Sequence, residues 1–160
     1  MRYSDPTLPS HELAPFAEDI RRLFADLERS LKNGSQPSGE CEPPLDVFEN
    51  EGALEVRLDV PGVPASSLRV VVKRGVLLVV GAKTATVVTT RGEATFHVVE
   101  RDVGRFARAV RLGAAVDVGR ARAALVNGEL RVTLPKLVER RGRETRIPID
   151  VAPPPTGDVP

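Results

Sequence analysis

The residues best suited to chemistry in this 160-residue chain are an isoleucine–proline–isoleucine triplet, and the chemistry they suit is non-covalent binding. Two of the three isoleucines in the chain are Ile147 and Ile149. Pro148 extends the backbone between them, so both side chains project the same way. Such a pair on a polar tether fits docking beside a sheet edge, where several weak contacts together bind firmly. Closure of the chain's own sheet by this triplet is an equally good interpretation.

Residues that carry covalent or metal chemistry are scarce. Cys41 is the one cysteine, and with His11 and His97 it makes neither an internal disulfide nor a convincing zinc site. The sequence contains no nucleophile elbow or phosphate-binding loop, and no predicted cleft pairs its carboxylates. We therefore expect no catalytic residue, no metal, no cofactor and no enzyme activity. His97 is interpreted as structural, and Cys41 as incidental because no cation adjoins it in sequence.

An amphipathic helix is predicted from Pro15 to about Leu31. Glu18 and Asp19 favour its N-terminal end, and residues 34–44 after it have the composition of a flexible linker. The stripe either packs on the chain's own domain, as most such helices do, or binds other proteins. Its apolar residues recur at spacings of three and four, which places them on one face: Phe16, Ile20, Leu23, Phe24, Leu27 and Leu31.

Residues 45–135 have the pattern of short β-strands. Val is more frequent than Leu in the chain, and no proline occurs within residues 65–134, as expected of paired strands. Asn127-Gly128 is a strong hairpin signal, and Arg74-Gly75 is a plausible tight turn. The pattern predicts an all-β fold, an antiparallel sandwich with a long excursion at 84–95. Strands are expected near 54–60, 68–73, 76–80, 96–99, 105–112, 121–126 and 130–134.

The net charge of +1 hides an uneven distribution. Residues 1–42 carry five basic and eight acidic side chains, whereas residues 100–146 carry twelve basic and six acidic ones. Nucleic-acid binding needs arginines on one face, yet Arg105 and Arg111 alternate away from Arg108, with Phe106 the only aromatic among them. A solvated or interfacial role is therefore favoured over a nucleic-acid-binding module. No apolar run is long enough to span a membrane, and we expect a cytoplasmic protein.

The chain resembles the small heat-shock proteins of the α-crystallin (Hsp20) family, of the bacterial type. The most specific match is the strand motif ending in Leu134-Pro135-Lys136, followed downstream by the isoleucine–proline–isoleucine triplet. That strand motif spans residues 127–136, and individually weaker matches lie at 44–49, 59–63, 75–77, 81–83 and 104–108, so that the resemblance extends over about residues 44–150.

The resemblance implies an immunoglobulin-like sandwich, the α-crystallin domain, at residues 44–138. A variable N-terminal arm at 1–43 would carry the helix and linker, and a C-terminal extension at 139–160 would carry the triplet. The implied function is that of an ATP-independent holdase, which binds partly unfolded client proteins, prevents their aggregation and hands them over to ATP-dependent chaperones. The alternative is a co-chaperone of related sandwich fold that binds a folded ATP-dependent chaperone.

The resemblance also implies site residues. In the bacterial and plant branch, two subunits exchange a strand from the central loop, and larger homo-oligomers form when the tail of one dimer lies in a groove of another. That groove would lie between residues 68–73 and 121–126. The implied residues are Phe96, His97, Val98, Val99 and Arg108 for the dimer, Ile147, Pro148 and Ile149 for the tail, Val70, Val72 and Ala124 for the groove, and Phe16, Ile20, Leu23, Phe24 and Leu27 for clients.

Overall fold

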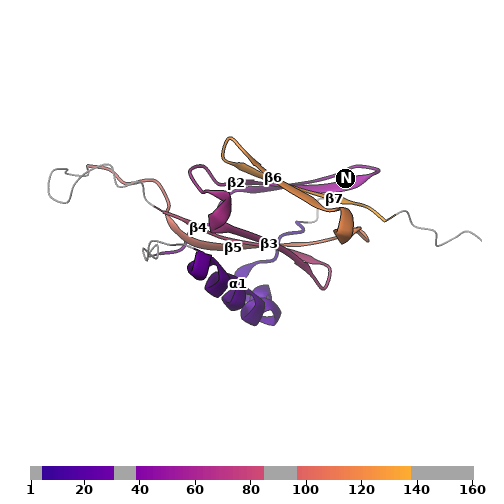
Figure 1. Cartoon of the computed structure of the whole chain (residues 1–160), viewed down its shortest axis with the longest axis horizontal. Helices are drawn as coiled ribbons and strands as arrows, with labels where there is room; N and C mark the ends of the chain where they lie inside the picture. Colours follow the sequence, from indigo (N-terminus) through magenta and orange to yellow (C-terminus); the bar gives the residue numbers. More distant parts are fainter. Residues whose placement is uncertain (1–4, 31–38, 85–96, 138–160) are drawn as a thin grey trace, which may run out of the picture.

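The computed structural model describes residues 5–30, 39–84 and 97–137, and it arranges them as two stacked β-sheets with a helix against one of them (Figure 1). All neighbouring strands are antiparallel, which confirms the predicted sandwich. One sheet has the order β1-β2-β7-β6, built from Leu45–Glu49, Ala53–Asp59, Glu129–Pro135 and Arg122–Val126. The other has the order β3-β4-β5, built from Leu68–Lys73, Val76–Lys83 and Gly104–Arg111.

Two tight turns connect strands as the sequence predicts. Arg74 and Gly75 join β3 to β4 with φ angles of 52° and 72°, and Asn127 and Gly128 join β6 to β7 with 52° and 83°. Positive φ at both central residues gives the turn a twist that matches that of the flanking strands. A Cβ atom on Gly128 would also lie 2.8 Å from the Pro61 Cα, so this position needs glycine for space as well.

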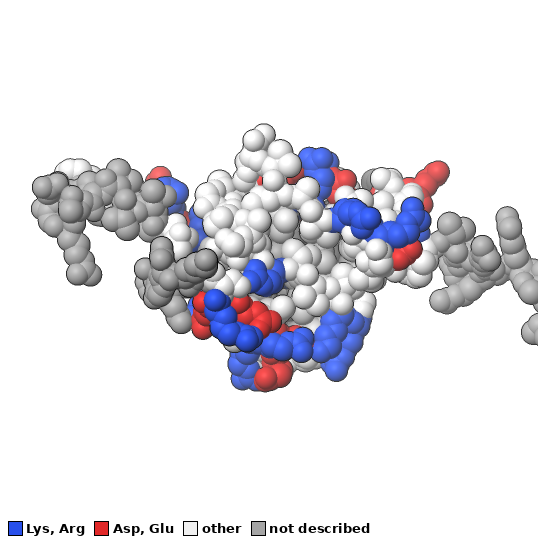
Figure 2. Space-filling model, in the orientation of Figure 1, with Lys and Arg blue, Asp and Glu red and all other residues white. Residues whose placement is uncertain are grey.

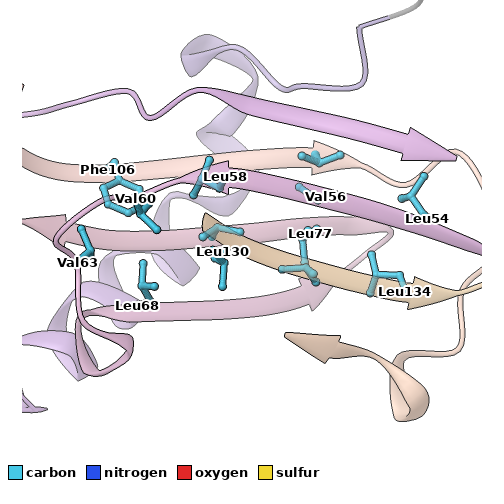
Figure 3. Packing of buried hydrophobic residues seen from close by; sticks show 13 residues of the cluster. Leu54, Val56, Leu58, Val60, Val63, Leu68, Leu77, Phe106, Leu130 and Leu134 are labelled. Atoms are coloured by element: carbon cyan, nitrogen blue, oxygen red, sulfur yellow. The ribbon is translucent and has the colours of Figure 1, made fainter. Parts of the chain in front are cut away.

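The sandwich core is aliphatic, as the composition predicts. Alternate residues of the strands point between the sheets, and Leu58 lies opposite Leu130 in the register of β2 and β7. Phe106 is the single aromatic residue of this cluster (Figure 3). The buried members are Leu54, Val56, Leu58, Val60, Val63, Leu68, Leu77, Val79, Phe106, Val110, Leu130, Val132 and Leu134.

The N-terminal arm is helical, although its α-helix begins two residues later than predicted. Ser10–Phe16 form a 3₁₀-helix that includes Pro15, and α1 follows at Ala17–Ser30. A 3₁₀ turn is a common way for a helix to begin, and here it takes up the residues that the pattern assigned to the first α-helical turn. Two further 3₁₀-helices lie at Ala65–Ser67 and Val118–Arg120.

The described part of the expected strand at residues 96–99 forms no strand within this single chain. Phe96 lies outside the described residues, and His97, Val98 and Val99 belong to no strand. Among the described residues there is also no helix with the length and apolar character that crossing a membrane requires.

The interior of the sandwich predicts a strong effect of enlarging Gly81. This residue lies opposite Phe106, and an added Cβ would come within 2.3 Å of the ring Cζ and 2.9 Å of Leu68 Cδ2. Because the ring is buried, Gly81→Ala is expected to lower the free energy of unfolding by about 1–3 kcal/mol, measured by urea denaturation. Gly113→Ala is the matched control, because no atom lies within 4 Å of its added Cβ. Equal effects of the two substitutions would contradict this account.

Candidate interaction surfaces

The arm packs on the outer face of sheet β3-β4-β5, and it does so through the stripe predicted from sequence. Helix α1 contacts β4 and β3. Phe16, Leu23 and Leu27 are buried, whereas Ile20 and Phe24 are half-buried. The five residues expected to bind clients therefore lie against the chain's own sheet, which is the alternative that the helical pattern left open. Binding of other proteins by this stripe requires the arm to leave the sheet.

The packing under the arm is separate from the sandwich core. Phe16 and Leu8 of the arm form a cluster with Val76, Leu78 and Ala109 of the sheet. None of these five residues belongs to the cluster between the sheets. A cleft of about 940 Å³ opens between the arm, residues 39–42 and β5, so the arm does not fill the sheet face. The arm and the sandwich are thus held by two distinct sets of apolar contacts.

One ion pair fastens the start of α1 to the edge of the sheet. Lys73 Nζ donates to Asp19 Oδ1 at 2.6 Å, and the Asp19 side chain is 12% exposed. The hydrogen bond from Lys73 holds the pKa of Asp19 below its ordinary value of 3.8, although burial opposes this. The pair stabilises the docked arm above the ordinary carboxyl pKa, and this stabilisation is lost as the pH falls through the lowered value.

A second surface lies between the edge strands β3 and β6, which follow the same margin of the two sheets (Figure 3). Val70 and Val72 lie opposite core residues of β4, so they point between the sheets. Both remain half-buried because no further strand covers this margin in the described part of the chain. Leu125 of β6 packs against the same core and is likewise half-buried. These half-buried side chains make the margin apolar, and it is the place where the resemblance puts the tail-accepting groove. It is here called the β3/β6 groove.

The groove lining differs from the expectation at one position. Ala124 lies opposite Arg131, which is exposed on the outer face of the sheet, so Ala124 points away from the groove. Ala123 and Leu125 lie opposite core residues Val132 and Leu130 and point into it. Successive side chains of a strand point to opposite faces, so Ala123 and Ala124 cannot both face the groove. The sequence did not show which of them does, because β6 is apolar on both faces. The expected occupant of the groove, Ile147-Pro148-Ile149, lies outside the described residues.

The residues expected at the dimer interface divide into two groups. Val98 and Val99 are 72% and 73% exposed, and His97 beside them is exposed too. Arg108 is instead largely buried on β5, where it forms an ion pair with Glu42. In the single chain Arg108 therefore lines the cleft beside β5, with its guanidinium paired to Glu42.

The outer edge of β5 is covered by two segments that sequence reasoning missed. Leu8 N–H donates to the Ala109 carbonyl at 2.9 Å, and Arg111 N–H donates to the Pro6 carbonyl at 2.8 Å. Further along, Cys41 N–H donates to the Arg105 carbonyl at 3.0 Å. Covering protects an edge strand from pairing with other chains. No helical or alternating pattern marks these short segments, so local sequence offered no signal for them.

The remaining chemical candidates are the lone cysteine, metal-ligating side chains and the basic run. Cys41 is half-buried with its Sγ 3.5 Å from the Gly104 carbonyl oxygen, and burial raises the pKa of its thiol. The described residues contain no group of three or more His, Cys, Asp or Glu side chains placed to hold a metal ion. Arg105 and Arg111 pair with Glu28 and Glu12 of the arm, so the basic run is partly neutralised by the chain's own acidic end.

Sequence comparison relates this chain to stress proteins. The model of the Hsp20/alpha crystallin family matches residues 46–150. Heat shock protein 16 of Schizosaccharomyces pombe is 31% identical over 135 residues, which are 84% of this chain and 94% of that protein. An 18.9 kDa heat shock protein of Oryza sativa subsp. japonica is 31% identical over 145 residues, covering 86% of this chain and 81% of its own length.

Comparison with solved structures gives the same relationship. Heat shock protein 16.0 from Schizosaccharomyces pombe superimposes with a TM-score of 0.58 at 31% identity, covering 69% of this chain and 99% of that one. A small heat-shock protein from Xylella fastidiosa, described as having a distinct high order structure, gives a TM-score of 0.59 at 23% identity and covers 69% and 100%. The second likeness supports the fold alone.

Proposed function

This chain belongs to the Hsp20/alpha crystallin family, and from that premise we propose that it is an ATP-independent holdase. It binds partly unfolded proteins through apolar surface and keeps them from aggregating until ATP-dependent chaperones refold them. No catalytic group is needed, because a protein that binds the unfolded state lowers the concentration available for aggregation. Cytoplasmic location is part of the same proposal.

The observation that carries the proposal is the separate apolar cluster under the arm. Because Phe16 and its neighbours share no buried residue with the sandwich core, the arm can leave the sheet while the sandwich stays folded. Its departure uncovers two apolar surfaces, namely the stripe of α1 and the sheet residues Val76, Leu78 and Ala109. Warming or excess client would favour that departure, since an exposed apolar segment of a client replaces the lost contacts.

A client assay without nucleotide tests the holdase activity. At equimolar ratio to a heat-aggregating client, the chain is expected to suppress the rise in light scattering, and added ATP should not change this. Ile20→Ser with Phe24→Ser should reduce protection, because both half-buried residues belong to the stripe. Ala17→Ser with Ala25→Ser, on the exposed side of α1, is the matched control. Unchanged client aggregation in the presence of the wild-type chain would rule out the holdase proposal.

We also propose that the tail of one dimer docks in the β3/β6 groove of another and so builds larger homo-oligomers. The groove offers half-buried Val70, Val72 and Leu125, and burial of two isoleucine side chains contributes roughly 3–6 kcal/mol before the tether is ordered. Ordering the tether offsets much of this, so each contact is weak and reversible.

Adjacent alanines on β6 test the groove. Ala123→Glu places a charge in the groove, whereas Ala124→Glu places the same charge on the outer face. Ala123→Glu and the tail variant Ile147→Ala with Ile149→Ala should each reduce the assembly to dimers, and combining them should have no further effect. Ala124→Glu should leave the mass unchanged, as measured by size exclusion with light scattering. A wild-type chain that is already dimeric, or equal effects of the two glutamates, would contradict tail docking.

We propose further that the dimer forms by strand exchange through residues 96–99, adding to the free edge of β1. The valines at 98 and 99 are exposed in the single chain, which leaves them available to a partner. The edge of β5 is covered, and β3 and β6 border the groove, so β1 is the remaining open edge among the described strands. Strand addition at that edge supplies main-chain hydrogen bonds.

Charged substitutions of the two valines test strand exchange. In the tail-variant background, Val98→Asp with Val99→Asp should convert dimers to monomers, measured by native mass spectrometry. The stability of the monomer should change by no more than about 0.5 kcal/mol, since both side chains are largely exposed. Val126→Asp, at a valine that is 59% exposed on the β6–β7 hairpin, is the control. Dimers that persist in the double variant would exclude this interface.

A further inference from the structure

The outer face of sheet β3-β4-β5 has a regular charge pattern. The central strand presents Val76, Leu78, Val80 and Ala82 on this face, and all four are buried. The edge strands carry the basic side chains, with Arg69 and Lys73 on β3 and Arg105 and Arg111 on β5. An apolar strip thus runs along the sheet between two rows of positive charge.

The arm fits this strip in length. A helix of 14 residues, the length of α1, is about 21 Å long. The distance from Val76 to Ala82 along β4 is six residue steps, or about 20 Å. Lys73, Val76 and Arg111 lie side by side in one row of the register, and Ala82 and Arg105 lie side by side in another. Basic side chains therefore lie at both ends of the apolar strip.

The arm places an acidic side chain next to three of these basic side chains. Asp19 pairs with Lys73 at 2.6 Å, and Glu28 pairs with Arg105 at 2.5 Å at the opposite end of the helix. Glu12, in the 3₁₀-helix before α1, pairs with Arg111 at 3.3 Å. Figure 2 shows acidic and basic side chains next to one another in the region of α1, below a largely uncharged front of the sandwich. In two of the three pairs, therefore, the acidic N-terminal segment meets the basic segment 100–146, and in the third it meets Lys73 of β3.

We propose that this face is a receptor for an amphipathic helix with acidic side chains at matching positions, occupied by the chain's own α1, and that the three ion pairs form a salt-sensitive latch. The apolar contacts provide most of the binding free energy of the arm. The charged side chains on both edge strands determine which helix binds and in which orientation. Partly exposed pairs each change an equilibrium by about 1.4- to 5-fold, and salt screens them. Rising ionic strength therefore releases the arm. The latch does not depend on the proposed holdase function. The further inference that arm release activates client binding does depend on it.

Hydrogen exchange of the intact chain tests the latch without any client. A free helix of 14 residues is marginal in water, so release exposes the amides of residues 17–30 to exchange. Raising NaCl from 0.05 to 0.5 M should speed their exchange about three- to tenfold, while the amides of β4 stay protected and report an intact sandwich. Salt-independent exchange of α1 would overturn the proposal.

Charge variants locate the effect. Lys73→Glu should speed α1 exchange at low salt by at least about fivefold, because attraction becomes repulsion. Lys136→Glu is the matched control, since Lys136 pairs with Glu49 at 2.6 Å on the other sheet. Glu12→Arg alone should speed exchange, and adding Arg111→Glu should restore it. Equal effects of the two lysine variants, or no rescue by the charge swap, would overturn the latch even if client protection is observed.

Discussion

The burial of β4 on both faces is the constraint on which the rest of the structure depends. Seven consecutive residues of this strand, from Val76 to Ala82, are buried. Alternate side chains point to opposite sides, so Leu77 and Val79 fill the sandwich while Val76 and Leu78 need a cover on the outside. The second sheet covers the inner side. The arm covers the outer side, and its departure leaves apolar surface in water.

This division is the basis of the proposal that the arm leaves the sheet while the sandwich stays folded. The contacts between the sheets are continuous across seven strands, whereas the arm contributes a short stripe, a partly filled cleft and ion pairs near solvent. A conformational change needs an element with two arrangements of similar free energy, and the proposed release of the arm would draw on the weaker of these two sets of contacts. The β3/β6 groove has a similar origin, because among the described strands none lies beyond β3 and β6 to cover their inward-pointing side chains.

Much of the fold was predictable because its signals are local. A run of valines before the Arg74-Gly75 turn predicted β3 at its observed bounds, and the Asn127-Gly128 turn fixed the neighbouring register through two positive φ angles. The stripe of α1 was evident from spacing alone. The orientation of Ala124 could not be predicted, because both faces of β6 are apolar and the residue pattern then does not indicate which face points to the core. The cover on the β5 edge by residues 5–8 and 39–41 was missed because backbone pairing leaves no mark on side-chain pattern.

The amino-acid sequence by itself determined the sandwich, its turns, the amphipathic helix and the charge difference between the two ends of the chain. Those features depend on residue type and on spacings of two to four, which neighbouring residues impose on one another. Only the tertiary structure decided that the stripe faces its own sheet, that Asp19 meets Lys73 and that Arg108 turns to Glu42. These contacts join residues more than fifty positions apart, and their partners are selected by the way the layers stack rather than by any local preference.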